Sequence, residues 1–325
     1  MTIQPTCPGA IAPTLRPRRL ISVGDLDRED VAALFAMAED YAALNASVVK
    51  KCDRLKGRTQ INLFFEKSTR TQMSFELAGK RLGADVVNFS VASSSVSKGE
   101  SLADTVLTLN AMGPDLIVVR HSAAGAPELI ADLADCAIVN AGDGMREHPT
   151  QALLDAFTIQ QSFGGVEGLV IAICGDILHS RVARSNINLL QMLGAQVRLV
   201  GPPSLLPAAA DRLTPFVYTD LAQGLDGADV VMALRLQTER MTGGFIPSLR
   251  DYHAQYGITE KAMAAAKPDA KVLHPGPMNR GVEIEARIAD DPERCLVLDQ
   301  VAAGVAIRMA VLDALAHGQS GPADG

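Results

Sequence analysis

The stretch Phe64-Phe65-Glu66-Lys67-Ser68-Thr69-Arg70-Thr71 joins an apolar run to a segment with helical periodicity. Gln60–Phe65 predicts a buried strand, and Thr69–Leu82 predicts a helix that ends at Gly83. The Ser-Thr-Arg-Thr string then lies at the start of a helix, where unpaired backbone N–H groups and the helix dipole attract anions. Its hydroxyls and guanidinium add donors that suit phosphate oxygens. The same string would also suit an ordinary helix cap with a surface arginine, so other parts of the chain must decide.

Strands and helices are predicted to alternate along the whole chain, which is typical of parallel sheets with helices on both faces. A helix begins near Asp25–Asp30 and runs through Ala46. The remaining elements of the first half are strands Ala84–Phe89, Leu116–Arg120 and Ala137–Asn140, and helices Leu102–Met112 and Glu128–Leu133. The long helical run Pro149–Gln161 is the candidate link between two domains. The second half contains strands Leu169–Cys174, Gln196–Val200, Val230–Leu234 and Lys271–Leu273, and helices Ser180–Leu193 and Ala303–His317.

Length and composition limit the class of protein. The 325 residues suffice for two domains, and 48% hydrophobic residues fit a globular chain. A net charge of −7 argues against a general nucleic-acid surface, and the absence of Trp argues against stacking platforms for single strands. No apolar run reaches the roughly 18 residues of a membrane span. We therefore expect no nucleic-acid partner and no membrane partner.

The cysteines and the N-terminus point to a reduced cytoplasmic protein. Five cysteines occur without a CxxC or metal-like spacing, so we expect free thiols and no metal site. The segment Met1–Arg19 has no apolar core of a secretory signal. It is interpreted as a loose extension, or equally as a docking arm for another subunit.

Two further clusters lie in the first half. Ser93-Ser94-Ser95-Val96-Ser97-Lys98 is either a flexible solvent loop or a loop that carries a cation to an anionic ligand. Arg120-His121 ends a predicted strand, at the sheet edge where open α/β proteins bind ligands. There the arginine is either a site residue or the point where the strand meets water.

The start of the long helix holds another candidate. Pro149 suits a first helical turn and places His148 near the N-cap, with Gln151 one turn on. The histidine either caps the helix or faces a ligand above the sheet edge.

Three clusters follow predicted strands of the second half. Gly175-Asp176 resembles a dinucleotide-binding turn, but no GxGxxG is present, so a nicotinamide cofactor is poorly supported. Arg181 heads the next helix, where it suits a carboxylate. Arg235-Leu236-Gln237 follows a later strand, and His274-Pro275-Gly276-Pro277 is a stiff turn that exposes backbone carbonyls.

Together these motifs carry a resemblance. The order FFEKSTRT, SxxKGES, a strand-end Arg-His, HPTQ, GDxxxxR, RxQxER and HPGP resembles the aspartate/ornithine carbamoyltransferase superfamily, on its aspartate side, from about Leu20 to Leu315. The resemblance implies an α/β fold of two doubly wound parallel-sheet domains joined by a long helix, with the C-terminal helix returning to the first domain. Residues 1–147 with 303–325 would form a carbamoyl phosphate-binding domain, and 148–302 an aspartate-binding domain.

The resemblance also assigns residues. It places the catalytic groups at Arg70, Thr71, Arg120 and His148. It places carbamoyl phosphate binding at Ser68, Thr69, Arg70, Thr71, Arg120, His148, Gln151, Gly276, Pro277 and Ser94. Ser93 or Ser95 could take the place of Ser94. It places aspartate binding at Lys98, Arg181, Arg235 and Gln237, with Ser94 and Lys98 reaching in from a neighbouring subunit.

The implied activity is carbamoyl transfer from carbamoyl phosphate to the α-amine of L-aspartate, an early committed step of pyrimidine (UMP) biosynthesis, without a cofactor or metal. The implied partners are the two substrates and a catalytic homotrimer with shared sites, which could dock dihydroorotase-like or regulatory chains.

The chemistry of the residues agrees with that activity. Two anionic substrates need several cations, and Arg70, Lys98, Arg120, Arg181 and Arg235 supply them in an acidic chain. Ornithine carbamoyltransferase is the nearest alternative, but in that relative a Cys follows the last His, where this chain has Pro275. A non-catalytic subunit of a pyrimidine-pathway complex is a second alternative, and a nicotinamide-dependent dehydrogenase is a third.

Overall fold

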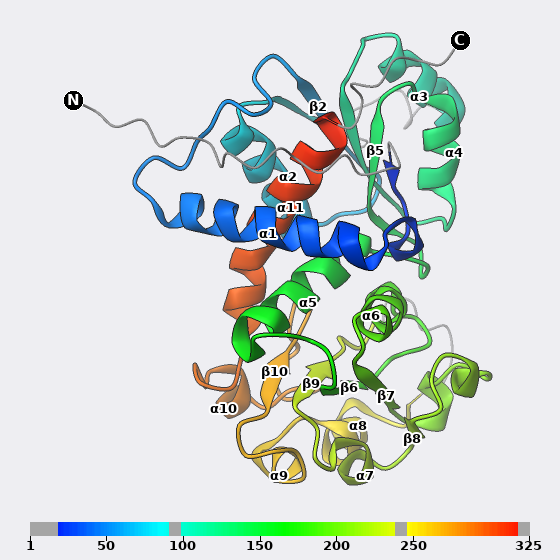
Figure 1. The fold of residues 1–325 in the computed structure, drawn as a ribbon. Helices are drawn as coiled ribbons and strands as arrows, with labels where there is room; N and C mark the ends of the chain where they lie inside the picture. Colours follow the sequence, from blue (N-terminus) through cyan, green and yellow to red (C-terminus); the bar gives the residue numbers. More distant parts are fainter. Residues whose placement is uncertain (1–18, 91–98, 238–245, 318–325) are drawn as a thin grey trace. The chain divides into compact units, whose positions relative to one another are not determined.

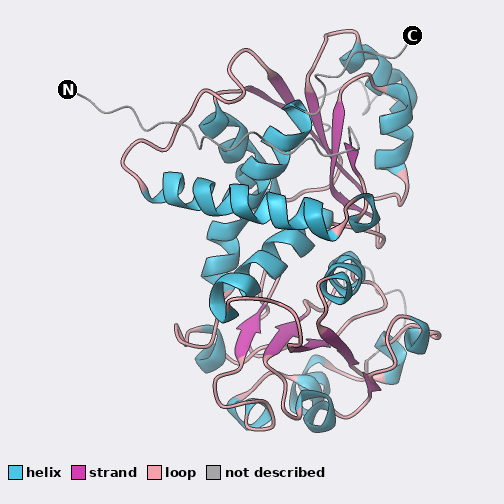
Figure 2. Cartoon of the chain, in the orientation of Figure 1, coloured by secondary structure: helices cyan, strands magenta, loops and turns pink. Residues whose placement is uncertain are grey.

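A computed structural model describes residues 19–90, 99–237 and 246–317. The chain divides into two compact units. Unit 1 comprises Met1–Leu154 together with Ala302–Gly325, and unit 2 comprises Asp155–Val301. Both units are α/β, with helices packed over a five-stranded sheet (Figures 1 and 2). The predicted fold class is therefore confirmed.

The sheet of unit 1 has the order β1-β5-β4-β2-β3, and every ladder between these strands is parallel. Its strands are β1 (Arg19–Leu20), β2 (Thr59–Phe64), β3 (Asp85–Ser90), β4 (Leu116–His121) and β5 (Ala137–Asp143). The central strands are buried on both faces because helices cover both. From β2 the chain continues to β3 on one side, and from β4 it continues to β5 on the other side. The position between β2 and β4 is therefore the topological switch point, where open α/β sheets bind ligands.

Helices of unit 1 begin and end where local chemistry dictates. They are α1 (Arg28–Ala46), α2 (Thr69–Leu82), α3 (Leu102–Asn110), α4 (Ala126–Leu133), the start of α5 (Pro149–Phe163) and most of α11 (Val297–His317). Asp27 closes a capping box at the start of α1. At the end of α2, Gly83 adopts a left-handed φ of 89°, which glycine tolerates best.

The C-terminal helix α11 packs against other helices of unit 1, as predicted. The Tyr41 hydroxyl of α1 donates to Asp313 Oδ2 at 2.6 Å, and Arg54 Nε lies 3.0 Å from the same oxygen. Arg308 Nη1 donates to the Ser74 hydroxyl of α2 at 2.7 Å. Desolvation of the buried phenol, followed by its contact with Asp313, raises the pKa of Tyr41 well above its ordinary value. These contacts join residues that are far apart in sequence.

Unit 2 repeats the architecture with the order β10-β9-β6-β7-β8, again wholly parallel. Its strands are β6 (Val170–Cys174), β7 (Gln196–Val200), β8 (Val217–Tyr218), β9 (Val230–Ala233) and β10 (Lys271–Leu273). Its helices include α6 (Arg181–Met192), α7 (Leu221–Leu225), α8 (Leu249–Tyr256), α9 (Glu260–Met263) and α10 (Ala286–Ala289). The switch point of this sheet lies between β6 and β9.

A few elements differ from expectation. Arg19, which the sequence placed in a loose extension, instead pairs in β1 with Ile138. The closing helix begins at Val297 rather than Ala303. Two-residue strands such as β8 and short helices such as α9 escaped prediction because they carry too few residues to show a period.

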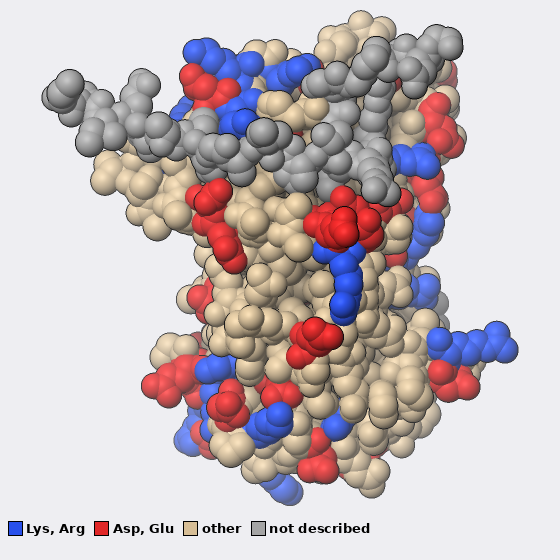
Figure 3. Space-filling model, in the orientation of Figure 1, with Lys and Arg blue, Asp and Glu red and all other residues tan. Residues whose placement is uncertain are grey.

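The surface and the polar groups agree with a chain of mixed charge. Acidic and basic side chains intermix on the face shown in Figure 3. Within the described residues, no helix has the length and apolar character to cross a membrane. The same residues contain no cluster of three or more His, Cys, Asp or Glu that would hold a metal ion.

Candidate active site

The first turn of α2 follows β2 at the switch point of unit 1. Ser68 is the N-cap residue, but its side chain makes no capping hydrogen bond, and the first turn carries no acidic residue. Thr69 and Arg70 are exposed, whereas Thr71 is buried. A 14-residue helix with its first N–H groups uncapped by Ser68 offers partial positive charge to an anion.

Arg120 lies beside this turn, near the end of the neighbouring strand β4. The Phe65 N–H donates to the Arg120 carbonyl at 2.8 Å, so the chain after β2 stays paired with β4. Arg120 Nε lies 3.3 Å from Glu66 Oε2, and its Nη1 donates to the Ala141 carbonyl at 3.1 Å. Glu66 and Ala141 thus fix the direction of the guanidinium.

His148 and Gln151 follow β5, the next strand of the sheet. Both side chains are buried, with 4% and 8% of their surface exposed. The Gln151 N–H donates to the His148 carbonyl at 2.9 Å, which places both side chains at the start of α5. The two residues therefore lie at the same sheet edge as Arg120.

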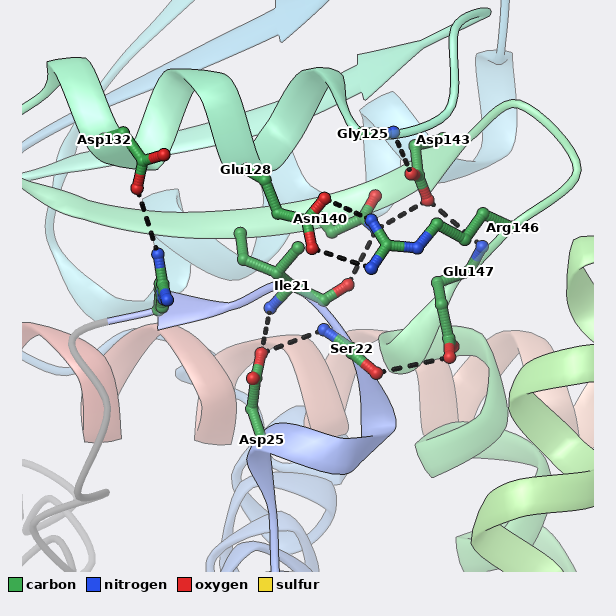
Figure 4. Close-up of polar contacts among 11 residues, drawn as sticks. Ile21, Ser22, Asp25, Gly125, Glu128, Asp132, Asn140, Asp143, Arg146 and Glu147 are labelled. Carbon is green, nitrogen blue, oxygen red and sulfur yellow. Dashed lines mark hydrogen bonds and ion pairs between the residues drawn. The ribbon is translucent and has the colours of Figure 1, made fainter.

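The loop that precedes His148 is held by a buried carboxylate, Asp143 (Figure 4). Asp143 Oδ1 accepts from Asn140 Nδ2 at 2.9 Å and from the Glu147 N–H at 3.1 Å, while Oδ2 accepts from the Gly125 N–H at 2.9 Å. The Asp143 N–H in turn donates to the Glu147 carbonyl at 3.1 Å. His148 therefore extends from a closed loop.

The N-terminal segment supports the same loop (Figure 4). Asn140 Nδ2 also donates to the Ile21 carbonyl at 2.8 Å, and the Ser22 hydroxyl donates to Glu147 Oε1 at 3.3 Å. Asp25 Oδ2 accepts from the N–H groups of Ile21 and Ser22 at 2.7 and 2.9 Å. These contacts explain why the short strand β1 belongs to the sheet.

In unit 2, Gly175 and Asp176 follow β6 at the switch point. Gly175 has φ of 119°, and a Cβ there would lie 2.9 Å from the Tyr252 hydroxyl, so only glycine fits. Asp176 is fully buried, and its Oδ1 lies 2.8 Å from His179 Nδ1. Burial raises the pKa of Asp176, while hydrogen bonds from His179 and from the Gln237 backbone oppose the shift.

Arg181 and Arg235 follow adjacent strands of unit 2. Arg181 is the first residue of α6, yet only 4% of it is exposed. A buried cation at a helix N-terminus opposes the helix dipole, so folding alone does not favour it. Arg235 and Gln237 are half-buried in the segment after β9, and the Gln237 backbone reaches Asp176.

Gly276 and Pro277 follow β10, and the peptide bond between them is cis. Gly276 adopts a left-handed φ of 64°, and its N–H donates to His274 Nδ1 at 2.8 Å. The predicted residues of unit 2 therefore follow three neighbouring strands, β6, β9 and β10, as those of unit 1 follow β2, β4 and β5.

Ser94 and Lys98, two of the predicted site residues, fall outside the described residues. The sequence reasoning missed Glu66, which contacts Arg120, and it missed Asp143 and Glu283, which hold the segments beside His148 and Gly276. An acidic residue beside a turn-forming glycine, as in Gly142-Asp143-Gly144, was the available signal for one of them.

Comparison with known proteins shows the family of the chain. Residues 18–161 match the family model "Aspartate/ornithine carbamoyltransferase, carbamoyl-P binding domain", and residues 167–315 match "Aspartate/ornithine carbamoyltransferase, Asp/Orn binding domain". The aspartate carbamoyltransferase catalytic subunit of Granulibacter bethesdensis is 62% identical over 306 residues, which cover 94% of this chain and 96% of that protein. The same subunit of Methylorubrum populi is 61% identical over 305 residues, 94% of this chain and 96% of that protein.

Solved structures agree. Aspartate transcarbamoylase from Trypanosoma cruzi in complex with carbamoyl phosphate and aspartate is 34% identical, with a TM-score of 0.83, and the match covers 93% of this chain and 98% of that one. Its complex with N-(phosphonacetyl)-L-aspartic acid is also 34% identical, with a TM-score of 0.83, over 92% and 96% of the two chains. The chain described here belongs to the aspartate/ornithine carbamoyltransferase family.

Proposed function

We propose that this chain transfers the carbamoyl group of carbamoyl phosphate to the α-amine of L-aspartate, giving N-carbamoyl-L-aspartate and phosphate. The name of the bacterial relatives and the ligands of the trypanosome structures support the reaction. The proposal assigns residues 1–147 with 303–325 to carbamoyl phosphate and 148–302 to aspartate. We also propose that the chain acts in the cytoplasm, in pyrimidine biosynthesis.

We propose that separate residues bind the phosphate, the carbamoyl group and the aspartate carboxylates. The first turn of α2, from Ser68 to Thr71, binds the phosphate, with Ser94 from a neighbouring subunit. His148, Arg120 and Gln151 hold the carbamoyl group. The carbonyls of Gly276 and Pro277 accept hydrogen bonds from its amino group. Lys98, Arg181, Arg235 and Gln237 bind the aspartate carboxylates.

The chemistry is a single displacement. The amine nitrogen of aspartate forms a bond to the carbamoyl carbon, the bond from that carbon to the phosphate oxygen breaks, and the leaving phosphate takes up the amine proton. Negative charge grows on the carbonyl oxygen, where Thr71, Arg120 and His148 donate hydrogen bonds. Holding two substrates together supplies much of the acceleration.

The observation that carries the choice of aspartate is the pair of arginines after β6 and β9. The side-chain carboxylate of aspartate needs a cation, whereas the side-chain ammonium of ornithine needs an anion. A colorimetric assay with purified protein should detect carbamoyl-aspartate and no citrulline. Citrulline formation, or no product from either amino acid, would refute the proposal.

We propose further that the active form is a homotrimer in which Ser94 and Lys98 complete a neighbour's site. Arg70→Ala and Lys98→Ala proteins should each be nearly inactive, and mixed trimers should regain activity because some sites receive both intact residues. Purification through an affinity tag on one variant, followed by native mass spectrometry, verifies the mixed trimers, and mixed Arg70→Ala and Arg120→Ala trimers are the matched control without recovery. Equal activity in both mixtures would place the whole site in one chain.

A further inference from the structure

Hydrogen bonds join five buried polar residues of unit 2, with one link through the backbone of His274. Asn186 Nδ2 donates to Asp155 Oδ2 at 2.8 Å, and Gln300 Nε2 donates to Asp155 Oδ1 at 2.7 Å. Gln300 Oε1 accepts from the His274 N–H at 2.9 Å, and His274 Nε2 lies 3.1 Å from Glu283 Oε1. None of the five exposes more than 3% of its surface. Leaving any such group unpaired costs about 1–3 kcal/mol, so each link matters.

The contacts fix the protonation of the His274 ring. The Gly276 N–H can only donate, and it points at Nδ1 from 2.8 Å, so Nδ1 carries no proton. The ring proton then lies on Nε2 and is donated to Glu283 Oε1. The opposite tautomer would place two donors face to face at Gly276 and leave Nε2 without a donor for the carboxylate.

Glu283 connects both ends of the turn. Its Oε1 accepts from Nε2 of His274 and, at 2.6 Å, from the Asn279 N–H, so the two residues bracket Gly276 and Pro277. Glu283 is itself fixed, because its carbonyl accepts from the Ile258 N–H at 3.0 Å and its side chain is 1% exposed. Glu283 therefore anchors both ends of the turn, through His274 and Asn279.

We propose that Glu283 is a positioning residue for carbamoyl transfer: through His274 and Asn279 it holds the Gly276-Pro277 carbonyls where they receive the carbamoyl amino group. This inference rests on the proposed function. A merely structural staple would stabilise unit 2 without favouring one substrate. Loss of a positioning residue should lower kcat/KM for carbamoyl phosphate more than it changes the KM for aspartate.

The test compares three folded variants with wild type. Glu283→Ala removes the acceptor, and we expect kcat/KM for carbamoyl phosphate to fall up to about 10²-fold, the cost of misplacing a binding group by about 1 Å. The KM for aspartate at saturating carbamoyl phosphate should change less than about twofold. Glu283→Gln keeps an oxygen that accepts both hydrogen bonds and should recover most of the loss. Glu285→Ala removes a nearby carboxylate that contacts the Glu260 N–H instead, and should match wild type.

A second measurement does not depend on activity. The ¹⁵N shifts of the histidine rings, with His274 assigned from a His274→Asn spectrum, should show protonated Nε2 and bare Nδ1 in wild type. If Glu283 holds the turn, Glu283→Ala should also weaken the contact from the Gly276 N–H to Nδ1 and give a tautomer mixture, and Glu283→Gln should restore the wild-type signal.

The outcomes separate the two proposals. If wild type forms no carbamoyl-aspartate, the proposed function fails, whatever the ring shifts show. If wild type is active, then normal kinetics in folded Glu283→Ala, or equal losses toward both substrates, would overturn the positioning role alone. A Gln variant as impaired as Ala would overturn it too, because the charge and not the acceptor geometry would then matter.

Discussion

The two units secure their ligand loops with different kinds of buried carboxylate. Asp143 in unit 1 accepts only from N–H groups that do not titrate, on Asn140, Glu147 and Gly125. Glu283 in unit 2 shares the ring proton of His274. Both fix a segment that follows a strand. The Asp143 loop is therefore held by amide donors alone, whereas the turn held by Glu283 depends on which nitrogen of His274 carries the proton.

The largest effect is expected at Arg70, which we propose binds the phosphate without stabilising the fold of unit 1. Arg70 is an exposed residue in the first turn of α2. Arg70→Ala should lower kcat about 10²–10³-fold, as the loss of a preorganised charge does, with no change in stability. Steady-state kinetics and a melting curve measure both. Near-normal turnover would remove Arg70 from the proposed site.

An intermediate effect, on stability, is expected at Asp143, which holds the loop before His148. Asp143→Asn keeps one oxygen but turns an amide toward the Gly125 or Glu147 N–H, so two donors meet in a buried place. We expect a loss of about 1–3 kcal/mol in the free energy of unfolding, measured with urea. Asp132→Asn, at a pair on the surface, is the control that should change little. If both variants have the same stability, Asp143 does not support unit 1 as described.

The smallest effect on stability is expected at the exposed carboxylate Glu128, in contrast to the buried Asp143. Hydrogen bonds from Arg146, the largest cause, lower the pKa of Glu128, and both side chains are about two-fifths exposed. Arg146→Ala should therefore cost about 0.2–1 kcal/mol. Because the folded pKa is lowered, this contribution is present above the ordinary value of 4.5 and disappears as pH falls through the lowered pKa. Unfolding at pH 7 and pH 3 measures the difference, and a larger gap at pH 3 would contradict the sign.

Much of the fold was predictable because strands and helices differ in period. The helix Thr69–Leu82 and the strands Gln196–Val200 and Lys271–Leu273 have the predicted bounds. Their limits are set by local signals, such as Gly83 after α2. By contrast, β1 gains its partner Ile138 from more than a hundred residues away, and no local pattern reports that pairing.

The site divides in the same way. The charged groups after each strand could be predicted because parallel strands end at one edge. From the residues alone, Ser68–Thr71 was consistent with any phosphate ligand. The family resemblance narrowed the expected ligand to carbamoyl phosphate. The partners that orient these groups, Glu66 for Arg120 and Glu283 for His274, depend on tertiary contacts and had no sequence signal strong enough to name them.

The return of α11 to unit 1 has a consequence for synthesis on the ribosome. Asp313 supplies the carboxylate that Tyr41 and Arg54 contact, yet it is made after the whole of unit 2. Domains usually fold in the order in which they emerge. Here the second unit can complete its core first, and the first unit must wait, with its phenol and guanidinium in water, until the last helix of the chain has been translated.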